Sequence, residues 1–175
     1  MAGTADVLKG IQRYPGVHYP VLVPNLRGLQ DLFSLLDANP ADLPLTDEVS
    51  VFTAATEAFT RANLNCTIAE SLERLSNVAR AALDRGLRVR GYVSVVIACP
   101  YSGKTDYKRV REVAKELMEM GCYEVSLGDT IGKGRPHEVG DMLEEVKKVV
   151  SVENLAVSDS LSFSLRAMLL LNLLV

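Results

Sequence analysis

The residues best placed to do chemistry lie in one stretch, residues 123–132, which reads YEVSLGDTIG. Its first five residues predict a buried strand, and Gly128 and Gly132 allow the backbone that follows to turn and to approach a ligand closely. Asp129 and Thr130 stand at that bend. In α/β proteins, a carboxylate and a hydroxyl at the carboxyl end of a strand are typical of a functional site. One strand makes no active site, so the surrounding elements decide what this pair can do.

The surrounding elements alternate between helix and strand, because apolar residues recur first at helical spacing and then in short continuous runs. We predict helices over residues 6–14, 29–36, 67–86, 106–120 and 136–149, and strands over residues 19–24, 49–53, 89–97, 123–127 and 155–157. Such units imply a parallel sheet with right-handed crossovers, either an open doubly wound sheet or an arc of a (β/α)8 barrel. A complete barrel takes roughly 250 residues, so five strands would form only part of one.

Two local patterns add detail to this prediction. Thr67 with Glu70 three residues later is typical of a capping box, which predicts the start of a helix there. The strand predicted over residues 89–97 is apolar on both faces in its second half. That pattern indicates a central parallel strand covered by helices on both sides.

Composition limits the kind of partner. With 175 residues, 48% of them hydrophobic, the chain can bury one core. Its 19 basic and 22 acidic residues give a net charge of -3 and form no long runs, which argues against a nucleic-acid surface and against a polybasic membrane anchor. A small-molecule partner is therefore expected. Cys66, Cys99 and Cys122 have no C-x-x-C spacing, which indicates a reducing compartment rather than a disulfide framework or a zinc site.

The two ends of the sequence differ in character. The first ten residues lack the apolar core of a signal peptide and the Arg-rich character of a transit peptide, so the chain as written is expected to be cytoplasmic. From Ser158 the pattern changes, and residues 167–175 are almost purely apolar. A run of that length is too short to cross a bilayer, which takes about 20 residues. It resembles a truncated helix.

Four runs of sequence, in order, resemble the 3-hydroxy-3-methylglutaryl-CoA (HMG-CoA) lyase family: VLKGIQRYPGVHYPVLVPNLRG, FTRANLNCTIAES, VRGYVSVVIACPYSGK and MGCYEVSLGDTIGKGRP. The resemblance covers about residues 5–157, with a longer loop near residues 37–47. It implies a (β/α)8 barrel, of which residues 1–157 would supply about strands three to seven and their helices. Residues 158–175 would form a divergent or truncated tail. The family cleaves HMG-CoA to acetoacetate and acetyl-CoA with Mg2+ or Mn2+.

The resemblance also implies which catalytic parts to look for. Family members hold the metal with an Asp of an Arg-Asp pair on the first strand, a His-x-His pair ending the seventh strand and an Asn from a later loop. A Cys in a glycine-rich loop acts as the acid. Here the first strand would precede Met1, and the Cys and Asn would follow Val175. After residue 157 the sequence reads Ser-Asp-Ser, and an alternative alignment puts the pair near Leu161 and Phe163. Neither alignment supplies histidine, so we expect no catalytic residue and no metal binding through family ligands.

Four residues remain as candidates by this resemblance. Asp129 and Thr130 match the family's Gly-Asp-Thr loop, which faces the substrate, although a structural turn would explain them too. Arg90 matches the Arg of the R-G-Y-V-S strand and is expected either to bind an acidic group or to form an ion pair inside the barrel. Asn63 matches a loop that approaches the CoA moiety. Thr67 belongs to the same loop, but the helix cap explains it better.

Three other residues resemble site residues only superficially. Cys99 lies in a Cys-Pro-Tyr sequence, yet its neighbours match the end of a barrel strand, so we interpret it as a small buried residue. His18 and His137 are isolated, without a partner at metal-ligand spacing, and we interpret both as ordinary surface or turn histidines.

Three hypotheses follow. In the first, the chain is a partial lyase that is inactive by itself and that self-associates or aggregates through open barrel edges. In the second, it is a non-catalytic protein that binds CoA or an intact lyase subunit. In the third, the 175 residues are an incomplete reading of the gene for an ordinary active enzyme. The resemblance implies a mitochondrial location for that enzyme and an acyl-CoA substrate.

Overall fold

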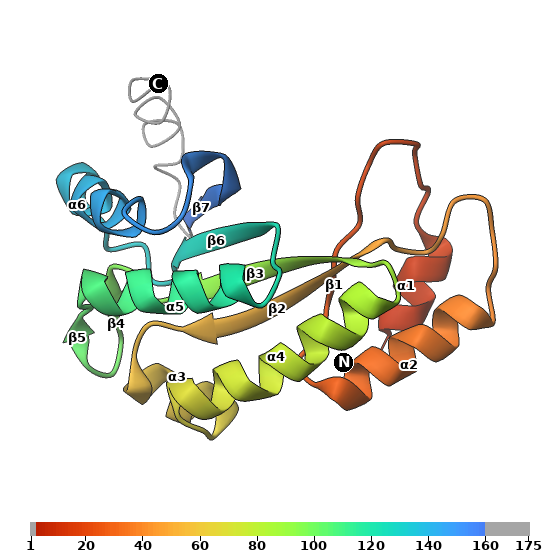
Figure 1. The fold of residues 1–175 in the computed structure, drawn as a ribbon, viewed down its shortest axis with the longest axis horizontal. Coiled ribbons are helices and arrows are strands. Elements are labelled where there is room, and N and C mark those ends of the chain that lie inside the picture. Colours follow the sequence, from red (N-terminus) through yellow and green to blue (C-terminus); the bar gives the residue numbers. More distant parts are fainter. Residues whose placement is uncertain (1–2, 160–175) are drawn as a thin grey trace.

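A computed structural model describes residues 3–159, which contain a parallel sheet of five strands (Figure 1). The strands are β1 (Val21–Leu22), β2 (Glu48–Ala54), β3 (Arg88–Ser94), β6 (Glu124–Asp129) and β7 (Leu155–Asp159). Their order across the sheet is β1-β2-β3-β6-β7, which is their order along the chain. A doubly wound sheet reverses its strand order at a switch point, whereas a barrel does not. The observed order therefore favours the arc of a barrel.

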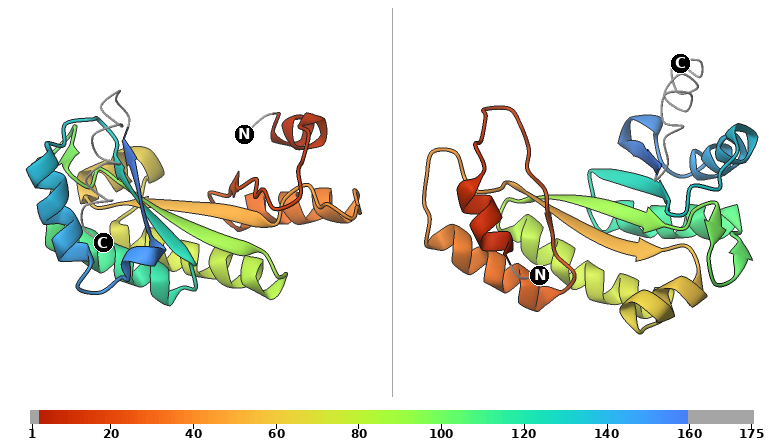
Figure 2. Two further views of the ribbon diagram at one scale, coloured as in Figure 1. Left: turned by 90° about the horizontal axis from the view of Figure 1, so that it is seen from above. Right: turned by 180° about the vertical axis from the view of Figure 1, so that it is seen from behind.

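Helices connect the strands (Figures 1 and 2). They are α1 (Thr4–Gly10), α2 (Leu26–Asp37), α3 (Glu57–Leu64), α4 (Ile68–Asp84), α5 (Tyr107–Glu119), α6 (Pro136–Val146) and the 3-10 turn η1 (Val152–Asn154). Helix α4 packs on β2 and β3, and α5 packs on β3 and β6. Helix α2 contacts α4, and α6 contacts α5. The helices thus form a row along the sheet.

Side-chain contacts show that α4 and α5 cover the same face. Thr53 of β2 shares a hydrogen bond of 2.7 Å with Ser71 of α4, so this face of β2 lies under α4. Val51, two residues earlier on that face, pairs in register with Gly91 of β3. A Cβ at Gly91 would lie 3.0 Å from Leu117 of α5. Neighbouring helices that cover one face of a parallel sheet, as α4 and α5 do, form the outer wall of a (β/α)8 barrel.

The opposite face is polar, which corrects one prediction. Strand β3 ends at Ser94 and alternates between buried Val89 and Val93 and the partly exposed Arg90 and Tyr92. The expectation that this strand is apolar on both faces was wrong. The apolar residues that suggested it, 95–97, follow the strand and turn the chain. The polar face is the one that lines a barrel interior.

A polar group lies at the amino ends of the strands. The Tyr123 hydroxyl donates a hydrogen bond of 2.9 Å to Oε1 of Glu48, which is only 1% exposed. The Arg88 guanidinium lies 4.0 Å from the centre of the Tyr123 ring and 3.9 Å from Oε2 of Glu48. Burial, followed by the hydrogen bond to Glu48, raises the pKa of Tyr123 to about 12.

Most predicted elements are present with shifted ends. The first helix ends at Gly10 and the last at Val146, several residues earlier than predicted. The capping box of α4 is confirmed, because Thr67 accepts a hydrogen bond from the Glu70 amide while Glu70 accepts one from the Thr67 amide. The elements that were missed are α3, the 3-10 turn η1 and a hairpin formed by β4 (Ala98–Cys99) and β5 (Gly103–Lys104). All are short, and their apolar residues show no clear period.

Replacing Gly91 with alanine tests the packing of α5 on β3. The added Cβ would lie 3.0 Å from Leu117 and 3.3 Å from Sγ of Cys122, so the interface must shift. We expect a loss of about 1–3 kcal/mol in the free energy of unfolding, measured by urea denaturation. Gly140→Ala in α6 is the control, because no atom lies within 4 Å of its added Cβ. Equal stability of the two variants would contradict this packing.

The raised pKa of Tyr123 predicts a pH effect. The folded chain keeps this phenol protonated while the unfolded chain, with a tyrosine pKa of about 10, ionises it. Folding stability is therefore lost as pH rises from about 10 through about 12. Burial also raises the pKa of Tyr107, so absorbance titration of the six tyrosines should show a late change that Tyr123→Phe diminishes and that Tyr101→Phe, at an exposed position, leaves in place. A late change that Tyr123→Phe leaves undiminished would refute the assignment.

Candidate active site at the carboxyl ends of the strands

The carboxyl ends of the parallel strands meet at one edge of the sheet, at the left in Figure 1. Four connections leave the strands at this edge: residues 23–25 after β1, α3 after β2, the β4–β5 hairpin after β3 and the loop 130–135 after β6. Such an edge is where α/β barrels bind substrates. The candidate residues are Asp129 and Thr130 at the end of β6, Arg90 within β3 and Asn63 in α3.

Asp129 holds its own loop together. The side chain is 6% exposed, and its Oδ2 accepts a hydrogen bond of 2.6 Å from the Gly134 amide. The Asp129 carbonyl accepts a second bond from the Gly132 amide at 3.1 Å. Oδ1 is buried and has no hydrogen-bond partner among residues 3–159. Oδ2 of Asp129 therefore stabilises the loop through Gly134, whereas Oδ1 makes no hydrogen bond within the described residues.

Thr130 also bonds to a neighbouring element. Its Oγ1 accepts a hydrogen bond of 2.8 Å from the amide of Val95, the residue after β3. The distance from the same hydroxyl to the Gly128 carbonyl is 3.4 Å, too long for a strong hydrogen bond. Thr130 thus connects the ends of β3 and β6, which the sequence does not reveal.

Arg90 lies on the polar face, four residues before the end of β3. It forms an ion pair with Glu124, its register neighbour on β6, and lies 5.4 Å from the centre of the Tyr92 ring. Arg90 Nε is buried without a hydrogen-bond partner in the described part of the chain. Of the two roles expected for Arg90, the structure shows the ion pair inside the barrel, and the guanidinium Nε remains as a donor without a partner among the described residues.

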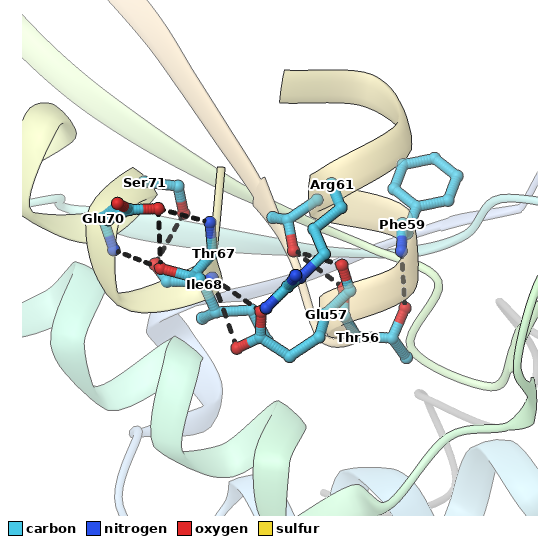
Figure 3. A network of polar contacts seen from close by, with 9 residues as sticks. Thr56, Glu57, Phe59, Arg61, Thr67, Ile68, Glu70 and Ser71 are labelled. Carbon is cyan, nitrogen blue, oxygen red and sulfur yellow. Dashed lines mark hydrogen bonds and ion pairs between the residues drawn. The ribbon is translucent and has the colours of Figure 1, made fainter. Parts of the chain in front are cut away.

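Asn63 and Thr67 lie where α3 ends and α4 begins, and Figure 3 shows Thr67 at this junction. Asn63 is exposed near the end of α3. The Thr67 hydroxyl accepts a hydrogen bond of 3.1 Å from the Glu70 amide, so the cap uses it. The bonds from Thr67 lower the pKa of Glu70. Glu57 of α3 accepts from the Ile68 amide at 3.4 Å and joins α3 to α4. Of these residues, only Asn63 is left open to a ligand.

Cys99 is buried at the same edge, as the sequence predicts for a small packed residue. It is 3% exposed and packs with Ala54 and Val95. Burial acts to raise the pKa of its thiol, but hydrogen bonds led by those from Ser102 and Thr56 outweigh burial and lower it. Sequence reasoning missed this effect, because Thr56 belongs to another strand's connection.

The histidines lie elsewhere. Nδ1 of His18 is 2.7 Å from Oδ2 of Asp47, in the loops before β1 and β2, at the opposite end of the sheet. His137 is exposed in the first turn of α6. Within residues 3–159 no group of three or more His, Cys, Asp or Glu side chains could hold a metal ion. The alternative histidine positions near Leu161 and Phe163 lie outside the described residues.

Comparisons with known proteins agree with this architecture. Residues 9–159 match the HMGL-like family model. Hydroxymethylglutaryl-CoA lyase, mitochondrial, of Bos taurus is 51% identical over 157 residues, 90% of this chain and 46% of that protein. The cytoplasmic 3-hydroxy-3-methylglutaryl-CoA lyase of Rattus norvegicus is 47% identical, over 90% of this chain and 43% of that protein.

Solved structures show the same fold. Hydroxymethylglutaryl-CoA lyase from Pseudomonas aeruginosa is 46% identical and superposes with a TM-score of 0.81, over 90% of this chain and 49% of that one. An HMG-CoA lyase solved in complex with coenzyme A and 3-methylmalate, 22% identical, superposes with a TM-score of 0.83 over 98% of this chain and 53% of that one. The chain spans about half the length of the relatives it matches.

No helix within residues 3–159 is long and apolar enough to cross a membrane.

The family match runs from α1 to the last residue of β7 and so includes every strand of the sheet. The prediction of a partial barrel is thereby confirmed. With its five strands forming an arc of a (β/α)8 barrel, the chain belongs to the HMGL-like family.

Proposed function

We propose that this chain derives from an enzyme that cleaves HMG-CoA to acetoacetate and acetyl-CoA. The observation that carries the proposal is 51% identity to a hydroxymethylglutaryl-CoA lyase across the strands and loops that form the candidate site. Relatives include forms named mitochondrial and cytoplasmic. We propose the mitochondrial location for the enzyme that contains this sequence, to be tested by fractionating cells.

The proposed roles follow from position and charge. Thr130 follows β6 at the edge where we propose that the barrel mouth holds a substrate. Asp129 shares the helix-covered face of β6 with Val125 and Leu127, so in our proposal it supports the loop that presents Thr130; its buried Oδ1 has no hydrogen-bond partner in the described part. Arg90 places a cation on the polar face, with Nε unused. Exposed Asn63 offers an amide to the CoA moiety at the same edge of the sheet. Thr130 and Asn63 lie at this edge of the sheet, whereas Arg90 lies deeper on the polar face, level with the first residue of β6. A cation below a polar rim suits an acyl-CoA that enters with its acidic acyl group first.

The family uses a divalent metal, but the described residues do not fit one. No group of three potential ligands exists among residues 3–159, and one of the two carboxylate oxygens of Asp129 is already bonded to Gly134. We therefore assign no catalytic step and no metal to these residues. In our proposal they bind and orient substrate, and the bond-breaking chemistry is not theirs.

Activity measurements test the proposal that these residues bind substrate but do not cleave it. We expect the purified 175-residue chain to release no acetoacetate from HMG-CoA above background in the presence of Mg2+ or Mn2+. The physical reason is that polarising the substrate hydroxyl requires a bound metal or an equivalent group. A complete lyase assayed in parallel is the positive control. Turnover above background would overturn the proposed inactivity.

A non-catalytic role in binding CoA, or an intact lyase subunit, is the second candidate. It is favoured by the exposed position of Asn63 and by the CoA-bound relative with the same fold. Calorimetry should detect CoA binding that Asn63→Ala weakens several-fold. Asn77→Ala, at an exposed position on α4, should leave it unchanged. Equal affinities for the two variants would remove Asn63 from the proposed site, and copurification with a complete lyase tests the subunit alternative.

The sheet edges suggest self-association. Among residues 3–159, β1 pairs only with β2 and β7 only with β6. Unpaired edges and a half-open polar face favour contact with another chain. We expect the 175-residue chain to sediment as oligomers or aggregates in the ultracentrifuge. A monodisperse monomer with a cooperative thermal transition would contradict this expectation.

A further inference from the structure

Val95 has an unusual backbone. It follows β3 directly and has φ 55, in the left-handed region that β-branched residues rarely adopt. Among residues 3–159, the only other non-glycine residue with a positive φ is Asn65, which caps the C-terminus of α3. Val95 is fully buried. Such a conformation persists only where the surroundings impose it, and it occurs most often at functional sites.

Two threonines, one after β5 and one after β6, hold Val95 in this conformation. Oγ1 of Thr105, the residue after β5, donates a hydrogen bond of 2.6 Å to the Val95 carbonyl. Oγ1 of Thr130 accepts one of 2.8 Å from the Val95 amide. Thr105 is 3% exposed, and its own amide bonds to the Ile97 carbonyl at 3.0 Å, which fixes it against the turn. Both peptide groups of Val95 are therefore held by side chains.

The flanking residues remain in the sheet. The Ser94 carbonyl accepts from the Ala55 amide at 3.1 Å, towards β2, and the Val96 amide donates to the Gly128 carbonyl at 3.2 Å, towards β6. Val95 is rotated between these two anchors. Only φ and ψ of Val95 separate its two peptide planes, so the bond from Thr105 to the carbonyl of one plane limits the orientations open to the amide of the other, which Thr130 accepts.

The consequence concerns the hydroxyl of Thr130. When a hydroxyl accepts from a backbone amide, one lone pair is used and its own hydrogen is directed elsewhere. The Gly128 carbonyl, at 3.4 Å, is a weak acceptor for that hydrogen. The Thr130 hydrogen, which the Gly128 carbonyl holds only weakly, is thereby available to a stronger acceptor at the barrel mouth.

We propose that Thr105 and Val95 are positioning residues that set the orientation of the Thr130 hydroxyl at the barrel mouth. This assignment rests on the proposed substrate contact of Thr130. Neither Thr105 nor Val95 needs to touch the substrate, because both act through the peptide groups on either side of the Val95 α-carbon. The β4–β5 hairpin thus determines how the loop after β6 presents its hydroxyl.

Hydrogen exchange of the Val95 amide tests this coupling in the 175-residue chain. Mass spectrometry with residue-level fragmentation tolerates self-association and requires no activity. Thr105→Val should raise the exchange rate of the Val95 amide at least tenfold, although Thr105 does not bond to that amide. Thr105→Ser, which keeps the hydroxyl, should stay close to the wild-type rate. Thr130→Val removes the oxygen that accepts from the Val95 amide, so this variant should show the same rise in the exchange rate of that amide through direct loss of its hydrogen bond.

The matched control is Thr46→Val. Thr46 is 2% exposed and donates to the Tyr19 carbonyl at 2.7 Å, at the opposite end of β2. This control should leave the Val95 amide as slow as in the wild type. The amides of Val89 and Val125, inside the ladder, serve as references for global unfolding in every sample.

Three results would overturn the proposal. The first is a Val95 amide in Thr105→Val that exchanges within twofold of the wild-type rate. The second is an equal effect of Thr46→Val, which would indicate general loss of stability. The third is a Thr105→Ser variant as fast as Thr105→Val. If Thr105→Val does not fold, then Thr105→Ser, which must stay slow, and Thr130→Val, which must become fast, decide the outcome. Because exchange is independent of turnover, this test and the activity assay can fail separately.

Discussion

The close contact between β3 and α5 at Gly91 is the constraint on which the rest of the sheet depends. The missing side chain lets Leu117 and Cys122 approach the strand, so α5 lies flat against it. That contact assigns the odd-numbered residues of β3 to the helix-covered face. Register then carries the assignment to β2 and β6, and the even-numbered residues, Arg90 among them, must face the barrel interior. The polar face is thus a consequence of packing on the other side.

Sequence periodicity predicted the alternating architecture well, because long helices such as α4 and α5 have clear apolar faces and end signals. It did not decide between an open sheet and a barrel, since both use the same local units. The family resemblance and the strand order made that choice. Short elements escaped prediction: α3 depends on the Thr56 cap, and the β4–β5 hairpin depends on pairing between two dipeptides. Neither leaves a period in the sequence.

The candidate site was predictable by residue type but not by contact. The position of Asp129 and Thr130 after a strand is visible in the sequence, whereas the partners they use are not. Asp129 bonds within its loop, Thr130 bonds to Val95, and Arg90 pairs with Glu124 on the next strand. Each partner lies on a different stretch of chain or in a turn whose shape depends on tertiary packing. Side-chain roles at strand ends are therefore decided by neighbours that no local pattern identifies.

The bond between Glu57 and the Ile68 amide has a mechanical meaning. Glu57 lies in the first turn of α3, and Ile68 is the first residue of α4 (Figure 3). The carboxylate is thus shared between the two helices, with Arg61 3.9 Å away. Helix α4 is in turn packed on β2 and β3. Helix α3 itself also contacts both β2 and α4, so the part of the mouth that contains Asn63 is packed on the barrel wall and not joined to it by this one long bond alone.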